Sequence, residues 1–149
     1  MRLRLAFALA LALAAPALAA DPVKITADQF VIDETANVAT FTGNAIVTRK
    51  TLTVWAPKVV VDYGEGGPSD INSFVASGGV RIKTSEQDVT GDRAIYDPNT
   101  EKLRVTGNVM VINASSTVGG PDMIVDLRTE TTTFIGGGSG RVTGVFTPK

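Results

Sequence analysis

Hydrophobic and polar residues alternate along much of the chain with a period of two, which predicts β-strands. The alternation is clearest around Gly43, Gly78 and Gly107, where every second residue is apolar or small and those between are mostly polar. One face of each strand is therefore expected to be buried and the other exposed to water. Around Gly107 the second face also carries Met110 and Ile112, which leaves two-sided burial open there. No stretch after residue 20 shows the periodicity and capping residues of a helix, so we predict an all-β domain.

One unit is repeated four times along this region. Each copy begins with seven residues that start at a small residue and end at an aspartate: 27–33, 56–62, 91–97 and 120–126. The aspartates are 29, 35 and 29 residues apart. Gly43, Gly107 and Gly136 each follow an aspartate by ten residues, whereas Gly78 follows Asp62 by sixteen. The longer second unit is explained by an insertion, the turn-rich stretch 64–70.

The glycines fall in the middle of predicted strands. Because glycine weakens a strand interior, its recurrence indicates a bend or bulge where the sheet folds over. Between strands, the sequence Asp-Pro-Asn-Thr at 97–100 predicts a turn, since the aspartate can hydrogen-bond its own backbone and proline presets φ. Asp33 and Asp126 start equivalent turns. Four such units predict a β-jelly roll of many short strands, with edges near residues 23–32 and 141–146.

Composition narrows the possible functions. The chain has 14 basic and 15 acidic residues and a net charge of −1, which argues against nucleic-acid binding. It has no cysteine and no histidine, which excludes disulfides, thiolate metal sites and a cysteine nucleophile, and removes the commonest general base. Carboxylates alone could form a glycosidase pair, but no spacing singles one out. We therefore expect no enzyme activity and no cofactor.

The first twenty residues have the pattern of a cleaved secretory signal. Arg2 and Arg4 precede an apolar run over residues 5–15, and small residues surround the expected cleavage point after Ala20. The alternative is a membrane anchor, although the apolar run is shorter than the about 20 residues that span a bilayer. We expect residues 1–20 to be removed and residues 21–149 to form one exported domain.

The best-formed copy of the repeat carries a resemblance. Its sequences GDRAIYD at 91–97 and LRVTGNVMV at 103–111 are similar to the repeat of the OstA-like family of periplasmic lipopolysaccharide-transport proteins. Weaker copies extend the similarity over the whole of residues 21–149. The cleavable signal, with no domain besides the repeat, favours the free periplasmic member of the family.

The resemblance implies a slightly open β-jelly roll that holds the acyl chains of lipopolysaccharide in an apolar groove. It also implies head-to-tail stacking into a bridge from the inner to the outer membrane. The implied partners are lipopolysaccharide, LptC at the inner membrane and the amino-terminal domain of LptD at the outer membrane.

Candidate site residues follow from the apolar strand face and the edges. The expected groove lining is Phe41, Val47, Phe74, Val80, Ile82, Val105, Val109, Val111 and Phe134. The alternative is that these residues fill a closed core. The expected docking edges carry Val23, Ile25, Val142 and Val145, since an edge strand has unpaired N–H and C=O groups. The alternative for these segments is frayed termini.

Other residues are weaker candidates. Lipid phosphates could be contacted by Arg49, Lys50, Lys83 and Arg141, although exposed basic residues commonly just keep strands soluble. Trp55 is expected to serve packing. The second functional hypothesis is an exported structural or glycan-binding β-solenoid. Aromatic residues at 6%, with one tryptophan, argue against a sugar-stacking platform.

Overall fold

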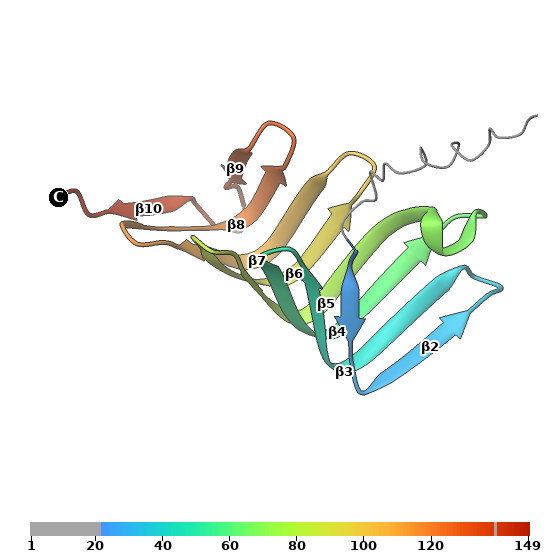
Figure 1. Ribbon diagram of the computed structural model, residues 1–149. Coiled ribbons are helices and arrows are strands. Elements are labelled where there is room, and N and C mark those ends of the chain that lie inside the picture. The colour runs from blue at the N-terminus through green and yellow to red at the C-terminus, as the bar shows by residue number, and fades with distance from the viewer. Residues whose placement is uncertain (1–21, 139) are drawn as a thin grey trace, which may run out of the picture.

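The computed structural model describes residues 22–138 and 140–149. The expected signal peptide, residues 1–20, lies outside them. The described chain forms a ten-stranded antiparallel sheet with one 3-10 helix and no α-helix (Figure 1). Within these residues no helix has the length and apolar character needed to cross a membrane. The all-β prediction is confirmed.

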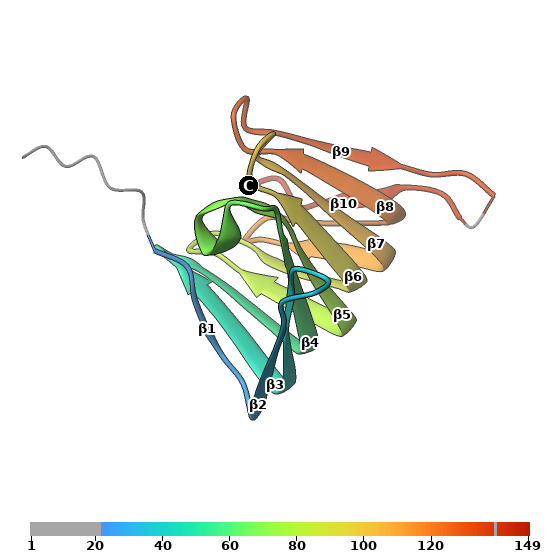
Figure 2. The same ribbon diagram turned by 90° about the vertical axis from the view of Figure 1, so that its right-hand side faces the viewer.

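The strands form a meander in chain order. Their bounds are β1 Lys24–Thr26, β2 Gln29–Asp33, β3 Val38–Arg49, β4 Leu52–Tyr63, β5 Ile71–Lys83, β6 Asp88–Asp97, β7 Lys102–Ile112, β8 Ser116–Asp126, β9 Thr131–Ile135 and β10 Thr143–Phe146. Figure 2 shows them following one another from β1 and β2 at one end to β9 and β10 at the other. Both β1 and β2 pair with β3, and both β9 and β10 pair with β8. Because β1 and β2 share one edge position and β9 and β10 share the other, the sheet is eight strands wide. Within the described residues its two edges do not pair with each other, so the sheet is open.

The strands bend at a common level. The strand register shifts at residues 42–45 of β3, 77–80 of β5 and 106–109 of β7. Gly43 and Gly107 have φ values of +86° and +83°, and the asparagines that follow them have φ values of 49°. Such left-handed residues insert a bulge, and a bulge bends a strand without ending its pairing. The bend predicted at the glycines is confirmed at Gly43, Gly78 and Gly107, whereas Gly136 follows the end of β9 instead of lying inside a strand. The strands that cross the bend are longer than the sequence indicates.

The bend folds the single sheet into two halves. The first half contains residues 24–26, 45–56, 80–91, 109–120 and 143–146, and the second half contains residues 29–42, 58–77, 93–106 and 122–135. Figure 1 shows β9 and β10 diverging from β8 because they belong to different halves. The inner faces of the two halves meet and form the core.

The core consists of rows of apolar side chains that run across the strands. In the second half, cross-strand pairing connects Phe41, Val59, Ala76, Ala94, Val105, Met123 and Phe134. Val59, Val105, Val109 and Met123 are the largest fully buried side chains. Burial of these apolar groups stabilises the fold. Met110 and Ile112, by contrast, are 40% and 49% exposed, so burial around Gly107 is one-sided.

Aspartates open three of the turns, as the sequence predicts. The Oδ1 atom of Asp97 accepts hydrogen bonds from the backbone N–H groups of Asn99 and Thr100, at 2.8 and 3.4 Å. Asp33 and Asp126 make the same pair of bonds in their own turns. In the second unit the turn is replaced by residues 64–70, which include the 3-10 helix Gly67–Ser69.

Both edges of the sheet are interrupted at the bend. The amino-terminal edge, expected as one strand, is split into β1 and β2. At the other edge, the chain leaves the sheet after β9 and returns as β10. Between them, Gly137 and Gly140 form an isolated bridge. In the fourth unit, the chain thus leaves the sheet at the level of the bend, where the other three units have only a bulge within a continuous strand.

Candidate functional site

A cavity of about 290 Å³ lies between the two halves of the sheet. Its lining comes from both halves: Val23, Val47, Arg49, Leu52, Val54, Val59, Phe74, Ala76, Ile82, Thr84, Gln87, Val89, Ala94, Tyr96, Leu103, Met123, Val125, Leu127 and Thr132. Val23 and Leu127 are 40% and 43% exposed, so the cavity reaches solvent beside them. Fifteen of the nineteen lining residues are aliphatic or aromatic, which suits alkyl chains, because these need dry and non-directional contact.

Three of the nine residues predicted to line the groove line this cavity, namely Val47, Phe74 and Ile82. Val80, Val105, Val109 and Val111 lie in the buried core. Phe41 and Phe134 are partly buried and pack against that core.

The cavity extends from residues beside the bend, such as Val59 and Ala76, toward the open side of the folded sheet. Close to the bend, side chains such as Ala45 and Val109 are buried in the core and do not line this cavity. The alternating pattern therefore identifies the face of a residue but not whether the facing half leaves space beside it. Val111, for example, does not line the cavity, although its cross-strand partner Val89 does.

Sequence reasoning missed the contribution of β4, β6 and β8. The nine predicted residues come from β3, β5, β7 and β9, whereas β4 and β6 also supply Val54 and Val89, and β8 supplies Met123. A signal for two of these was present. Val54 and Val89 occupy the same column of the repeat, eight residues before the aspartate.

Two aromatic pairs lie on the inner face of the second half, one in the middle of the sheet and one at its amino-terminal edge. Phe74 and Tyr96, on neighbouring strands in the cavity wall, have ring centroids 6.2 Å apart. Phe30, on the edge strand β2, stacks on Phe41 with centroids 4.5 Å apart, and it is 52% exposed. An apolar surface therefore continues from the interior to the amino-terminal edge.

The predicted edge residues lie at the two ends of the sheet. Ile25 is in β1 opposite Val47, and Val23 precedes it at the cavity rim. Val145 is in β10, and Val142 precedes this strand and lies close to Gly120. The short strands β2 and β9 occupy the same two edges. The sequence pattern did not predict that β9 would be an edge strand.

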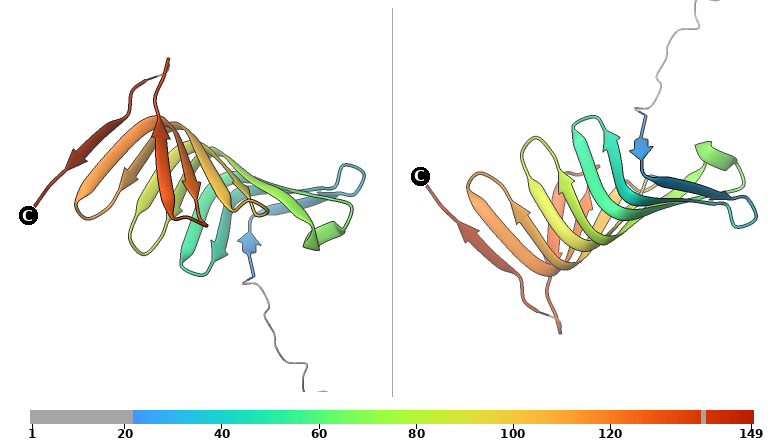
Figure 3. Two further views of the ribbon diagram at one scale, coloured as in Figure 1. Left: turned by 90° about the horizontal axis from the view of Figure 1, so that it is seen from above. Right: turned by 90° about the horizontal axis from the view of Figure 1, so that it is seen from below.

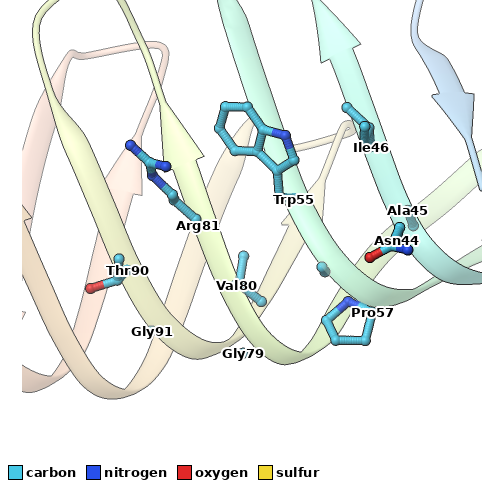
Figure 4. Close-up of a pocket in the computed structure, with 11 residues that line it drawn as sticks. Asn44, Ala45, Ile46, Trp55, Pro57, Gly79, Val80, Arg81, Thr90 and Gly91 are labelled. Carbon is cyan, nitrogen blue, oxygen red and sulfur yellow. The ribbon is translucent and has the colours of Figure 1, made fainter.

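A second hollow, of about 570 Å³, lies at the bend on the outer face (Figure 4). Beside it, the Arg81 guanidinium carbon lies 5.3 Å from the centroid of the Trp55 ring. Arg81 donates hydrogen bonds to both carboxylate oxygens of Asp88, at 3.0 and 2.7 Å, and these bonds lower the pKa of Asp88. Trp55 and Arg81 are cross-strand partners. Trp55, Arg81 and Asp88 therefore make contacts that are typical of neighbouring strands on the surface of a sheet.

Comparison with known proteins decides the family. Residues 24–131 match the model of a family described as "LptA/(LptD N-terminal domain) LPS transport protein". The chain belongs to this family. Its membership confirms the resemblance seen in the repeat and places the chain among LptA-like transport proteins rather than enzymes.

Individual relatives agree with this assignment. The lipopolysaccharide export system protein LptA of Haemophilus influenzae is 27% identical over 135 residues, which cover 86% of this chain and 78% of that protein. LptA of Escherichia coli K12 is 30% identical over 133 residues, covering 86% and 72%. The crystal structure of LptH, the LptA homologue of Pseudomonas aeruginosa, matches with a TM-score of 0.74 at 17% identity, over 85% of this chain and 96% of that one. The match to LptH confirms the open jelly-roll fold.

Proposed function

We propose that this protein carries lipopolysaccharide through the periplasm with the acyl chains of the lipid held between the two halves of the sheet. The observation that carries the proposal is the apolar cavity of about 290 Å³ in an open sheet of the LPS-transport family. Each methylene that moves from water into such a cavity contributes about 0.8 kcal/mol. Binding of this kind needs no catalytic group, and the energy for movement comes from elsewhere.

The second part of the proposal is a head-to-tail bridge. The sheet is eight bent strands wide, so its last strand runs antiparallel to its first. A second copy stacked in the same orientation can therefore continue the antiparallel pairing, with β9 and β10 against β2 and β1. Phe30 and Phe146 are 52% and 69% exposed at the two edges, and such a junction would cover them. Strand addition to an edge is a common mode of protein association.

The partners and location complete the proposal. After removal of residues 1–20, the domain works in the periplasm and receives lipopolysaccharide from LptC at the inner membrane. It delivers the lipid to the amino-terminal domain of LptD for assembly of the outer membrane. We expect the same two edges to serve these junctions, because the family resemblance implies that LptC and the amino-terminal domain of LptD share this fold.

Photocrosslinking to lipopolysaccharide tests the carrier function. A photoreactive residue is placed at Val47, Phe74 or Ile82 and, as matched controls on the same strands, at Thr48, Ser73 or Arg81. We expect crosslinks from the first three positions only, since the controls point away from the cavity. Equal crosslinking from both sets, or none in protein shown to be folded, would support the structural or glycan-binding alternative.

Cysteine pairing tests the bridge, and the chain has no cysteine of its own to interfere. Thr26 and Thr143 occupy the same cross-strand row on the two edge strands. We expect the double variant Thr26→Cys, Thr143→Cys to form disulfide-linked multimers on oxidation. In the control, Thr143→Cys is replaced by Thr117→Cys, which lies one strand inward on β8 and should give none. Multimers from the control alone would contradict edge-to-edge stacking.

A further inference from the structure

Among the described residues that line the cavity, Arg49 is the only charged one. It is the last residue of β3 and lies on the same face as Val47, so its side chain follows the apolar wall to the rim. The residue is half-buried, and no ion pair joins it to any residue in 22–138 or 140–149. A cation held beside apolar surface without a carboxylate partner is well placed to pair with an anion from outside the protein.

Polar groups stand beside Arg49 at the same rim. The turn between β5 and β6 contributes Thr84 and Gln87 to the cavity lining. The Thr84 hydroxyl oxygen accepts hydrogen bonds from the backbone N–H groups of Glu86 and Gln87, at 3.2 and 3.0 Å, which orders this turn. The side-chain amide of Gln87 is left as a further hydrogen-bond donor at the mouth.

The two rims of the folded sheet differ in charge. The rim of the first half, here called the β3–β4 rim, consists of residues 49–52, 83–88 and 112–116 and has three basic and two acidic residues. Figure 3 shows its three turns in a row, in teal, yellow-green and orange. The opposite rim consists of residues 33–37, 62–70, 97–102 and 126–130 and has nine acidic and two basic residues. An anion at the mouth is therefore repelled by one rim and attracted by the other within a Debye length of about 8 Å.

We infer that Arg49 binds a phosphate on the head group of the carried lipid and holds that head group against the β3–β4 rim. The inference rests on the proposed function, because it takes lipopolysaccharide as the occupant of the cavity. The guanidinium offers five N–H donors in a planar fork that matches two phosphate oxygens. With the phosphate at Arg49, the acyl chains extend past Leu52 and Val47 into the apolar interior.

The test compares two lipids and two variants. Binding of bisphosphorylated lipid A and of enzymatically dephosphorylated lipid A is measured for the wild type, for Arg49→Gln and for Lys102→Gln. Lys102 is an exposed basic residue on the opposite rim, so its substitution changes the net charge equally without touching the cavity. Thermal unfolding of each variant checks that the fold is intact.

We expect the wild type to bind the phosphorylated lipid roughly tenfold more tightly than the dephosphorylated one. Arg49→Gln should lose most of this preference and keep its affinity for the dephosphorylated lipid, whereas Lys102→Gln should behave as the wild type. A preference that survives Arg49→Gln, or one that falls equally in both variants, overturns the inference and leaves the carrier function standing. Failure of the folded wild type to bind either lipid overturns the carrier function itself.

Discussion

Gly107 lies directly against the side chain of Asp92, so that a methyl group added to the glycine would come within 2.6 Å of the Asp92 Cβ. Gly43 and Asp28 repeat this arrangement in the first unit, with a corresponding distance of 2.7 Å. Both glycines also have positive φ values. The bend therefore requires glycine at these positions for two separate reasons, the backbone conformation and the lack of space.

These two reasons can be separated by substitution. We expect Gly107→Ala to lower the free energy of unfolding by about 2–4 kcal/mol, from backbone strain together with overlap against Asp92. Gly79→Ala should lower it by only about 1–2 kcal/mol, because Gly79 has a φ of +99° but no atom within 4 Å of an added Cβ. Urea denaturation measures both values, and equal losses would show that the contact with Asp92 contributes nothing.

Two adjacent residues at the end of β7 are expected to respond differently to an introduced charge. Val111 is buried in the core, whereas Ile112 is 49% exposed on the outer face. Val111→Lys should destabilise the fold by more than about 3 kcal/mol, because it buries an unpaired charge. Ile112→Lys should change stability by less than about 0.5 kcal/mol. Thermal unfolding distinguishes them, and a large loss from Ile112→Lys would indicate that the outer face is covered.

Filling the cavity should block the lipid without unfolding the protein. Ala94 lines the cavity, so Ala94→Leu places three more carbon atoms in existing space and should change stability by less than about 1.5 kcal/mol. We expect lipopolysaccharide crosslinking from Ile82 to fall several-fold in this variant. Its control is Arg93→Leu on the neighbouring exposed position, which should leave crosslinking unchanged. Undiminished crosslinking in Ala94→Leu would place the lipid elsewhere.

The ion pair between Arg104 and Asp122 predicts a dependence of stability on pH. Arg104 donates to both carboxylate oxygens, at 3.0 and 2.6 Å, and these hydrogen bonds lower the pKa of Asp122. A lowered carboxyl pKa stabilises the fold above the unfolded value of about 3.9, and this contribution is lost as the pH falls through the folded value.

The corresponding measurement is the unfolding midpoint of wild type and Arg104→Gln at pH 7, 5 and 3. We expect the difference between them to be largest at the two higher pH values and to shrink at pH 3. Arg93→Gln is the control, since Arg93 makes no ion pair with a described residue. A difference for Arg104→Gln that grows toward pH 3 would have the wrong sign for this account.

Much of the fold could be predicted because local chemistry repeats. Asp33, Asp97 and Asp126 open their turns through their own side chains, and Gly43 and Gly107 mark the bend through their backbone freedom. Both effects depend on a few neighbouring residues, so a single sequence reveals them. The split of the amino-terminal edge into β1 and β2 was not predicted, because no glycine marks the bend at Ala27 and Asp28.

The cavity was less predictable, because it depends on how two distant halves meet. Val47 and Val109 have the same alternating pattern, yet one lines the cavity and the other lies in the buried core. What separates them is their position relative to the bend and to the opposite half. The same holds for Arg49. Its position two residues after Val47 predicts that it lies on the same face, but the sequence does not predict that no carboxylate among the described residues pairs with it.

The direction of the bend relative to the strand pairing has a mechanical consequence. Inter-strand hydrogen bonds run perpendicular to the strands, and therefore parallel to the line along which the sheet bends. We expect a rotation of one half away from the other to change backbone torsions near residues such as Gly78 and Gly79, with φ values of +93° and +99°, and to keep the ladder bonds within each half. The distance between the two halves should thus depend on the backbone torsion angles at the bend. Under the proposed carrier function, we therefore expect the cavity to widen for lipids with more acyl chains while the strand pairing is kept.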